Sequence, residues 1–411
     1  MSFYQDLKKF KSKIALLVDG DQEISYEKLI YESEKFALQL KERSLIFVLA
    51  DNDFESIVSL VGSEISNSVI MLISPNIDFS ALLNLINSYN PDFIFINKKK
   101  IFKLNNFENI FNYFNYELLK NNNSVSKLIN DDLFLLQTTS GSTGSPKNVK
   151  LSYINIQTNT NSIIKDLKIS NTDVAITTLP LTYVYGLSII NTHLKIGSKI
   201  ILNKSSIIEK NFWKRIILNK VNNFGGVPYI YEMLLKIGLK KEFFQNLKYT
   251  TVAGGHLDNK LKLSIIDFYE KLGISLITMY GAAEATSRMS FLPPKYSRKK
   301  NGSIGIPVSN GQLSLEDHTN KVIRKFYSKG EIIFKGKNVF MGYANSSNDL
   351  ITKDLNNSVL KTGDIGYFDE DNFFYVVGKK NRYIKIIGNR ISLDEMEKII
   401  QGYGYKNICS Q

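Results

Sequence analysis

The chain has 411 residues, 43% of them hydrophobic and 12% aromatic, which is enough for two or three packed units. Its single cysteine, Cys409, excludes an internal disulfide framework and a thiolate metal cluster. The first residues, Met1 to Lys13, are polar, and no apolar run approaches the length that spans a bilayer. We therefore expect a cytoplasmic protein with no membrane partner.

A net charge of +13 would suit an anionic partner such as nucleic acid, a carrier protein or a phosphorylated substrate. The lysines are dispersed along the chain rather than gathered in stripes, which favours a generally basic surface. The denser runs are 295–300 and 379–385, where only Tyr296 and Tyr383 interleave with basic residues. A basic nucleic-acid-binding protein is therefore a low-ranked alternative, and we expect no nucleic-acid partner.

Residues 1–130 read as alternating strands and helices. Ser25 is placed to cap a helix whose apolar residues recur at helical spacing. The continuous apolar runs 44–50, 68–73 and 92–96 are typical of parallel strands covered on both faces. Residues 105–130 are rich in asparagine without a clear period, and we expect them to be a connection. The pattern predicts a doubly wound α/β layer.

A run of small residues then separates two apolar segments, 132–137 and 149–153, and should form a hairpin-like loop between two strands. Glycines and small hydroxyl residues let backbone N–H groups converge on an anion, and a lysine adds a point charge. The predicted phosphate-binding residues are Thr139, Ser140, Gly141, Ser142, Thr143, Gly144 and Lys147. The spacing is not that of a Walker loop. A flexible Ser/Gly linker is the alternative, but two apolar strands leave little to link.

Residues 131–301 predict a second doubly wound layer. Ser152 is placed to cap a helix, and a strand at 174–179 leads into the segment 180–186. The strands 249–253 and 274–279 both run into glycine, at Gly254-Gly255 and Tyr280-Gly281. Because doubly wound sheets open their ligand crevice beyond the carboxyl ends of the strands, we expect a binding site there.

From Gly302 to Gly378 the pattern changes to short strands of period two, broken by Gly, Asn and Asp. This change predicts a small distorted β-barrel. Thr362-Gly363-Asp364 lies inside it. The carboxylate of Asp364 suits ribose hydroxyls, because it can accept two hydrogen bonds from a diol.

Several stretches together carry a family resemblance. They are 139–147; Leu179-Pro180-Leu181 through Gly186; Met279 to Glu284; Gly330-Glu331-Ile332 with Asn338 to Tyr343; Thr362 to Asp364; and Gly378 to Glu397. In this order the chain resembles the adenylate-forming, AMP-binding superfamily of acyl-CoA synthetases, luciferases and peptide-synthetase adenylation domains. The resemblance covers nearly the whole chain. It implies an N-terminal domain over 1–378, with a hinge and the truncated start of an α+β C-terminal domain over 379–411.

The resemblance also implies residue roles. The loop and Lys147 would hold the β- and γ-phosphates of ATP, and Glu284 would ligate Mg²⁺. Gly254, Gly255, Tyr280 and Gly281 would surround the adenine, with Asp364 and Lys379 at the ribose. Tyr183 and Gly186 would line the acyl pocket. Two plainer interpretations stay open, with Tyr183 as a core residue and Glu284 as a solvated glutamate at a helix start.

The implied activity is an AMP-forming acid–thiol ligase, whose partners are a carboxylic acid and CoA or the phosphopantetheine of a carrier protein. Three positions depart from the family pattern, with Ala283 for threonine, Lys379 for arginine and Asn381 for aspartate. The lysine that family members carry in the small domain is missing. The alternative is therefore a catalytically impaired nucleotide-binding remnant, or half of a split enzyme completed by a separate C-terminal polypeptide.

Overall fold

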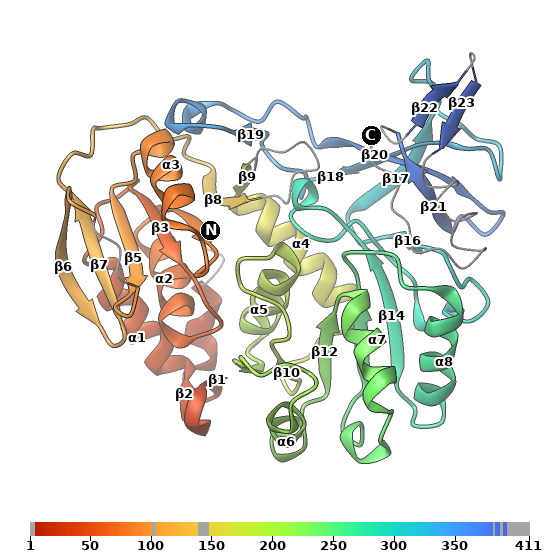
Figure 1. Ribbon diagram of the computed structural model, residues 1–411, viewed down its shortest axis with the longest axis horizontal. Helices are drawn as coiled ribbons and strands as arrows, with labels where there is room; N and C mark the ends of the chain where they lie inside the picture. The colour runs from red at the N-terminus through yellow and green to blue at the C-terminus, as the bar shows by residue number, and fades with distance from the viewer. Residues whose placement is uncertain (1–4, 101–103, 139–147, 381–382, 387–388, 393–411) are drawn as a thin grey trace.

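The computed structural model describes residues 5–100, 104–138, 148–380, 383–386 and 389–392 (Figure 1). Its α-helices are α1 (Tyr26–Ala37), α2 (Phe54–Ile65), α3 (Phe79–Tyr89), α4 (Tyr153–Leu167), α5 (Val184–Ile196), α6 (Lys210–Leu218), α7 (Pro228–Ile237) and α8 (Asn259–Glu270). Short 3-10 helices include η4 (Ala283–Ala285) and η6 (Ser347–Ile351). Among these described helices, none combines the length and the apolar character that crossing a membrane requires.

The strands form two large sheets and two small ones. The nine-stranded sheet has the order β16-β15-β14-β13-β12-β10-β11-β1-β2, and the eight-stranded sheet has the order β19-β9-β8-β4-β3-β5-β7-β6. The first sheet comprises β1 (Ile14–Leu17), β2 (Glu23–Ser25), β10 (Val174–Ile176), β11 (Lys199–Ile201), β12 (Asn223–Gly226), β13 (Tyr249–Val252), β14 (Ser275–Tyr280), β15 (Ser290–Phe291) and β16 (Ile306–Pro307). The second comprises β3 (Leu45–Leu49), β4 (Val69–Ile73), β5 (Phe93–Asn97), β6 (Phe107–Tyr113), β7 (Tyr116–Asn121), β8 (Leu133–Thr138), β9 (Asn148–Ser152) and β19 (Tyr343–Ala344).

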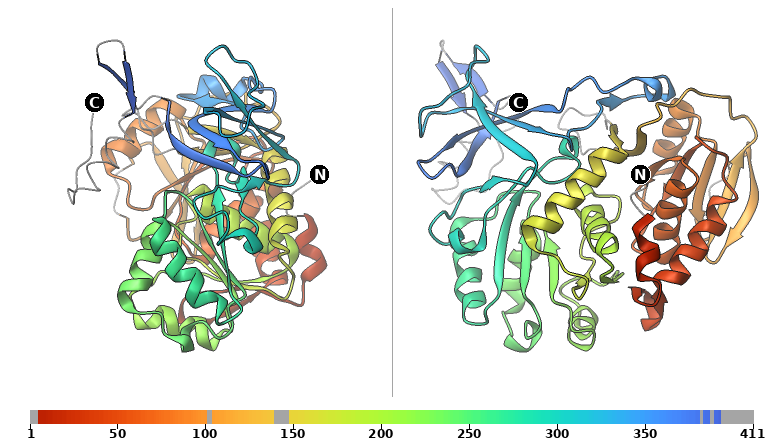
Figure 2. Two further views of the ribbon diagram at one scale, coloured as in Figure 1. Left: turned by 90° about the vertical axis from the view of Figure 1, so that its right-hand side faces the viewer. Right: turned by 180° about the vertical axis from the view of Figure 1, so that it is seen from behind.

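The two large sheets are joined by one apolar core. Side chains of α1, α2, α4 and α5 pack between them, with Leu29, Ile57, Ile156 and Leu187 in the same cluster. Helices α6, α7 and α8 cover the outer face of the nine-stranded sheet, and α3 covers that of the eight-stranded sheet. Helix α4 runs diagonally between the two halves (Figure 2). The predicted doubly wound α/β layers are confirmed.

Local signals placed the starts of α1 and α4 and several strands correctly. The side chain of Ser25 accepts a hydrogen bond from the Lys28 N–H at the start of α1. The side chain of Ser152 accepts one from the Asn155 N–H at the start of α4, and Asn155 completes a capping box. The runs 44–50 and 68–73 contain β3 and β4, and the run 92–96 covers all of β5 but its last residue; β3 pairs in parallel with both β4 and β5.

The expectation of an unstructured connection at 105–130 was wrong. Strands β6 and β7 form an antiparallel hairpin there, and β7 pairs with the edge of β5. Tyr116 and Leu118 of β7 are buried on the sheet while Glu117 between them is less so, which is a strand period. The turn is two residues long and Phe114 has a φ of 48°. A phenylalanine is not a usual residue for that conformation, so the turn gave no sequence signal.

The eight-stranded sheet contains strands from both sides of the expected boundary at 130/131. It takes β3 to β7 from before this boundary and β8, β9 and β19 from after it, whereas β1 and β2 join the nine-stranded sheet. Hydrogen bonding between β4 and β8 carries the sheet across the boundary. The division of the chain into domains, including the hinge at 379, stays a prediction.

The expected β-barrel region is an antiparallel sheet of four strands in the order β17-β18-β20-β21. These are β17 (Gly311–Glu316), β18 (Gly330–Gly336), β20 (Val359–Phe368) and β21 (Phe374–Lys379). Apart from Lys379, all four lie within the stretch 302–378 that was predicted to form short strands. No pairing joins β17 to β21 among the described residues, so the sheet is open along that side. Strands β22 (Tyr383–Ile386) and β23 (Asn389–Ser392) form a separate hairpin.

Helix α4 offers a test of how its start is fixed. Besides completing the capping box, the Asn155 amide donates to the carbonyls of Lys337 and Val339, at 2.7 and 2.8 Å. Asn155→Ala removes the donor from a buried carbonyl, that of Val339, and from the partly buried carbonyl of Lys337, and should cost about 2–3 kcal/mol of unfolding free energy in urea. Asn161→Ala, at an exposed position of the same helix, is the control and should change it by less than about 0.5 kcal/mol. Equal effects would contradict this assignment.

Candidate active site

The stem of the predicted phosphate loop is an antiparallel hairpin. Thr138 at the end of β8 pairs with Asn148 at the start of β9, and the Thr138 hydroxyl donates to the Asn148 side chain at 3.0 Å. The Asn148 amide in turn donates to the hydroxyl of Tyr89 at 2.8 Å. The predicted phosphate-binding residues Thr139 to Gly144, and Lys147, lie outside the described residues. The two strands that flank them are nevertheless described, and they end side by side at Thr138 and Asn148.

Glu284 is tied to this stem through strand β19. Tyr343 pairs with Val149 of β9, and its hydroxyl donates to the Glu284 carboxylate at 2.8 Å. The Phe340 N–H donates to the Glu284 carbonyl at 2.8 Å. Burial, followed by the charge of Glu284, raises the pKa of Tyr343, so this hydroxyl stays a donor. The carboxylate predicted to ligate a metal is therefore tied to the strand that forms one side of the stem.

Tyr280 and Asp364 meet directly although they come from different sheets. The Tyr280 hydroxyl donates to the Asp364 carboxylate at 2.6 Å. Burial and the neighbouring charge of Asp364 raise the pKa of Tyr280 far above its usual value, and Glu284 adds to the shift. Lys379 lies directly opposite Asp364 in the pairing of β20 with β21. The structure thus brings Tyr280, Glu284, Asp364 and Lys379 into one region.

Gly254 and Gly255 follow β13 and are exposed. Gly254 has a φ of +80°, and a Cβ there would lie 2.5 Å from the hydroxyl of Tyr183. Tyr183 immediately precedes α5 and is only partly buried. Its hydroxyl therefore borders the glycine turn predicted to take the adenine, while the residue also packs against the apolar core of the nine-stranded sheet, so its role in an acyl pocket stays a prediction.

Two other predicted glycines have a packing explanation. A Cβ on Gly186, inside α5, would lie 2.2 Å from the carbonyl oxygen of Pro180. A Cβ on Gly281 would lie 1.6 Å from the carbonyl oxygen of Ser287. Both positions need glycine so that backbones can approach closely. A direct role of Gly186 in an acyl pocket, or of Gly281 at the adenine, stays a prediction.

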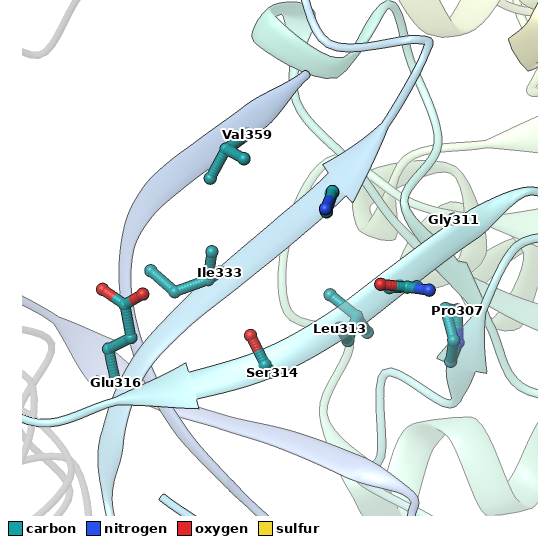
Figure 3. Close-up of a pocket in the computed structure, with 9 residues that line it drawn as sticks. Pro307, Gly311, Leu313, Ser314, Glu316, Ile333 and Val359 are labelled. Atoms are coloured by element: carbon teal, nitrogen blue, oxygen red, sulfur yellow. The ribbon is translucent and has the colours of Figure 1, made fainter. Parts of the chain in front are cut away.

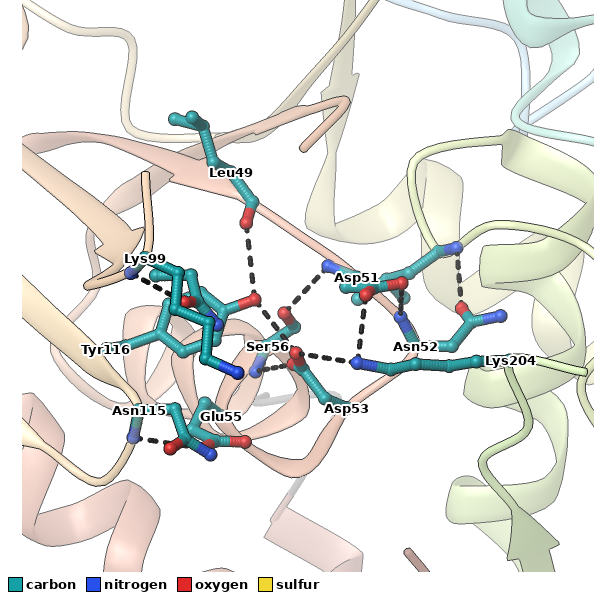
Figure 4. Close-up of polar contacts among 12 residues, drawn as sticks. Leu49, Asp51, Asn52, Asp53, Glu55, Ser56, Lys99, Asn115, Tyr116 and Lys204 are labelled. Carbon is teal, nitrogen blue, oxygen red and sulfur yellow. Dashed lines mark hydrogen bonds and ion pairs between the residues drawn. The ribbon is translucent and has the colours of Figure 1, made fainter. Parts of the chain in front are cut away.

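The segment 179–183 is held by groups that sequence reasoning missed. The Asn52 side chain donates to the Leu179 carbonyl at 3.1 Å and accepts from the Leu181 N–H at 3.0 Å. Figure 4 shows Asn52 between Asp51 and Asp53, in the network in which Lys204 pairs with Asp51 at 2.9 Å. The Gln137 amide, at the end of β8, donates to the Thr182 carbonyl. Nothing in their sequence context marks these polar residues as partners of a segment so far along the chain.

The donor set around Glu284 suits a hard cation bound mainly through its substrate. No group of three or more His, Cys, Asp or Glu side chains that could hold a metal occurs within the described parts of the chain. Mg²⁺ is commonly held by one or two carboxylates together with phosphate oxygens and water. A single carboxylate such as Glu284, joined through Tyr343 to the strand β9, fits that pattern.

A surface hollow lies apart from the predicted site residues. It has a volume of about 440 Å³ and is formed by strands β17, β18 and β20 (Figure 3). Leu313, Ile333 and Val359 contribute apolar side chains to it, with Glu316 at one end. None of the predicted site residues lines this hollow. This hollow is therefore not the candidate site.

Comparison with known proteins gives a family match for most of the chain. The family model described as AMP-binding enzyme matches residues 3–344. A 2-succinylbenzoate–CoA ligase of Geobacillus sp. is 28% identical over 270 residues, which is 66% of this chain but only 53% of that protein. The corresponding ligase of Oceanobacillus iheyensis is 26% identical over 401 residues, covering 94% of this chain and 80% of that protein. The chain thus spans about half the length of the first relative.

Solved structures show the same fold. The o-succinylbenzoate CoA synthetase of Bacillus subtilis, in complex with its acyl-adenylate intermediate, superposes with a TM-score of 0.80 at 21% identity. The superposition covers 98% of this chain and 82% of that protein. The same synthetase has been solved with ATP and magnesium ion, again with a TM-score of 0.80.

The close approach of Gly254 to Tyr183 can be tested by measuring the free energy of unfolding. Gly254→Ala forces a side chain into a left-handed conformation, at about 1–2 kcal/mol, and also into the Tyr183 hydroxyl. Gly20→Ala is the matched control, because Gly20 has a left-handed backbone, with a φ of +74° and a ψ of 15°, and no atom near its Cβ position. We expect Gly254→Ala to cost at least about 1 kcal/mol more in urea unfolding. Adding Tyr183→Phe should recover that difference, and an equal cost for the two glycines would refute the contact.

Proposed function

Because this chain belongs to the AMP-binding enzyme family, we propose that it activates a carboxylic acid with ATP and passes the acyl group to a thiol. The observation that carries the proposal is the arrangement of Tyr280, Glu284 and Asp364. The Tyr280 hydroxyl bonds to Asp364, and Tyr343 joins Glu284 to the stem of the phosphate loop. A nucleotide lying across this region would have its ribose at one carboxylate and its phosphates at the other.

The proposed first step joins the acid to AMP. A carboxylate oxygen of the substrate attacks the α-phosphorus of ATP, and the bond between that phosphorus and the bridging oxygen breaks, so pyrophosphate leaves. No side chain needs to act as a nucleophile. Positioning of the two reactants and stabilisation of negative charge supply the catalysis. Lys147 and the loop 139–144 would serve the β- and γ-phosphates, and Mg²⁺ at Glu284 would neutralise developing charge on the phosphate oxygens.

Remaining residues would position the nucleotide. Tyr280 would cover the adenine. Through the hydrogen bond that its hydroxyl donates to Asp364, it would also orient the carboxylate that is proposed to bind the ribose. Gly254 and Gly255 would let the purine approach the backbone. Lys379 would add a positive charge beside Asp364 from the neighbouring strand. As a lysine it offers a point charge rather than the planar fork of an arginine.

In the second step the thiol sulfur forms a bond to the acyl carbon, AMP leaves with the electrons of the carbon–oxygen bond, and the thiol proton passes to solvent. CoA is the favoured acceptor because the relatives are named as CoA ligases. A carrier-protein phosphopantetheine presents the same thiol. A chain that binds nucleotide without turnover would instead be a remnant, or half of a split enzyme that needs a separate C-terminal polypeptide.

Lys147→Ala tests the phosphate loop. Loss of a charge that stabilises the transition state should lower acid-dependent exchange of pyrophosphate into ATP on the order of tenfold to a thousandfold. The control is Lys165→Ala, an exposed lysine on α4 that should leave exchange unchanged. Unaltered exchange in Lys147→Ala would remove this residue from the mechanism. Nucleotide binding without exchange in the unsubstituted chain would favour the remnant or split enzyme.

Asp364→Asn tests the ribose contact by binding rather than by turnover. Replacing a charged acceptor by a neutral amide should weaken AMP affinity roughly tenfold, as measured by isothermal titration calorimetry. Asp267→Asn, at an exposed carboxylate on the outer helix α8, should leave the affinity within about twofold. If both variants bind AMP like the unsubstituted chain, Asp364 does not contact the nucleotide.

A further inference from the structure

Asp364 lies in an irregular stretch of strand β20. The pairing of β20 with β18 passes from Ile365 back to Lys361 while β18 advances by two residues, from Glu331 to Ile333. One residue of β18 therefore stands opposite three residues of β20, of which Asp364 is the last. Backbone groups in such a β-bulge lose their partners in the ladder and need others. The position of Asp364 thus depends on the groups that satisfy this bulge.

Side-chain hydrogen bonds replace the ladder at the bulge. The Thr362 hydroxyl donates to the Ile332 carbonyl at 2.8 Å and accepts from the Asp364 N–H at 3.1 Å. The Gly363 N–H donates to the carboxylate of Glu331 at 3.2 Å. Of these contacts, the one to Glu331 has a charged acceptor, and such hydrogen bonds are stronger than those between neutral groups. Glu331 therefore has a direct hold on the residue before Asp364.

The second carboxylate oxygen of Glu331 faces the end of strand β21. It pairs with the ammonium group of Lys380 at 2.7 Å. The Lys380 N–H in turn donates to the Gly363 carbonyl, also at 2.7 Å. Glu331, Gly363 and Lys380 thus form a closed ring in which each residue contacts the other two. Lys379, which precedes this ring on β21, lies opposite Asp364, so the ring borders both groups that are predicted to meet the ribose.

The two charged members of the ring differ in exposure. Only 9% of the Glu331 side chain is exposed, against 47% of the Lys380 side chain. An ion pair with a partly exposed partner contributes little to stability. A buried carboxylate is costly, however, unless hydrogen bonds satisfy it. The hydrogen bond to the Gly363 N–H is therefore the contact that best explains an acid at position 331.

Asp364 is oriented from two directions. The Tyr280 hydroxyl donates to one of its carboxylate oxygens at 2.6 Å, and the bulge sets the backbone from which the carboxylate projects. Binding a ribose diol requires carboxylate oxygens that can accept from two neighbouring hydroxyls at once. A small displacement of the backbone at Gly363 would spoil this geometry while leaving the glycine turn after β13 in place.

We infer that Glu331 is a positioning residue, which holds the bulge so that Asp364 binds the 2′- and 3′-hydroxyls and the site prefers ribose over deoxyribose. This inference rests on the proposed function, because the ribose contact of Asp364 is part of it. Glu331 acts through Gly363 and does not itself contact the nucleotide. The stretch Gly330-Glu331-Ile332, which the sequence singled out without a role for its acid, thereby acquires one.

The test compares AMP with 2′,3′-dideoxy-AMP, which lacks both hydroxyls. Affinities are measured by isothermal titration calorimetry at pH 7.5 on the full chain and its variants. The unsubstituted chain should bind AMP roughly 10- to 100-fold more tightly, as expected for hydrogen bonds to a charged group. Glu331→Met should reduce this ratio to within about threefold, because the Gly363 N–H loses its acceptor. Loss of folded protein affects both ligands alike and leaves the ratio unchanged.

Two conservative variants separate reach from charge. Glu331→Gln keeps an oxygen that can accept from the Gly363 N–H and loses the ion pair with Lys380, so it should retain most of the ratio. Glu331→Asp keeps the charge but is one methylene shorter, so it should lose most of the ratio. If Glu331→Met does not fold, the contrast between these two variants still decides.

Glu316→Met is the matched control. Glu316 lies directly opposite Glu331 in the pairing of β17 with β18, and it forms an ion pair with Lys361 at 3.3 Å. It is therefore an acid on the same sheet with its own lysine, and that lysine precedes the bulge. Its substitution should leave the ratio of the two affinities as in the unsubstituted chain.

An unchanged ratio in Glu331→Met would overturn the inference. So would a ratio that survives in Glu331→Asp and is lost in Glu331→Gln, because the ion pair rather than the bulge contact would then matter. Both results leave the proposed function standing, since the chain would still recognise the ribose. Equal affinity of the unsubstituted chain for the two nucleotides would overturn the inference together with the ribose contact of Asp364, and failure to bind AMP would count against the proposed function itself.

Discussion

The site depends on the segment 337–344, which ties together parts of the chain that are far apart in sequence. The Asn338 amide donates to the carbonyls of Ala285 and Arg288, and the Asn338 carbonyl accepts from the Thr286 hydroxyl. The same segment receives hydrogen bonds from Asn155 and then continues as β19 alongside β9. The position of Glu284, the stem of the loop and the start of α4 are thus fixed by one strip of backbone. Asn338 is 1% exposed, so these hydrogen bonds are shielded from water.

Much of the fold was predictable because its signals are local. Ser25 and Ser152 mark helix starts within a few residues, and runs such as 44–50 report burial on both faces of a strand. The hairpin at 107–121 was missed because its turn uses Phe114 with a positive φ, a conformation that a phenylalanine does not signal in a sequence. The sequence also did not predict which strands share a sheet, because the pairing of β1 with β11 joins residues that are almost two hundred positions apart.

The candidate site likewise contains residues that the sequence predicted and residues that it did not. Tyr280, Glu284 and Asp364 were predicted from motifs, and the structure brings them together. Tyr343 stood inside a recognised stretch but had no assigned role, because nothing local says that its hydroxyl reaches Glu284. Arg288 gave no signal at all, since an arginine in a sequence is ordinarily a solvated residue. Only the three-dimensional arrangement shows that this one is enclosed, with no acidic partner in the part of the chain that the structure describes.

Strand β21 carries a β-bulge that sets which residues can face Asp364. Ile365 pairs with Gly378, but Gly366 pairs with Val376, so Val377 has no partner of its own on β20. Side chains alternate along a strand, and one inserted or deleted residue here would turn Lys379 to the opposite face. Evolution can therefore exchange one cation for another at position 379 more readily than it can alter the length of this strand. Insertions and deletions between 364 and 379 should be rarer among descendants than point substitutions.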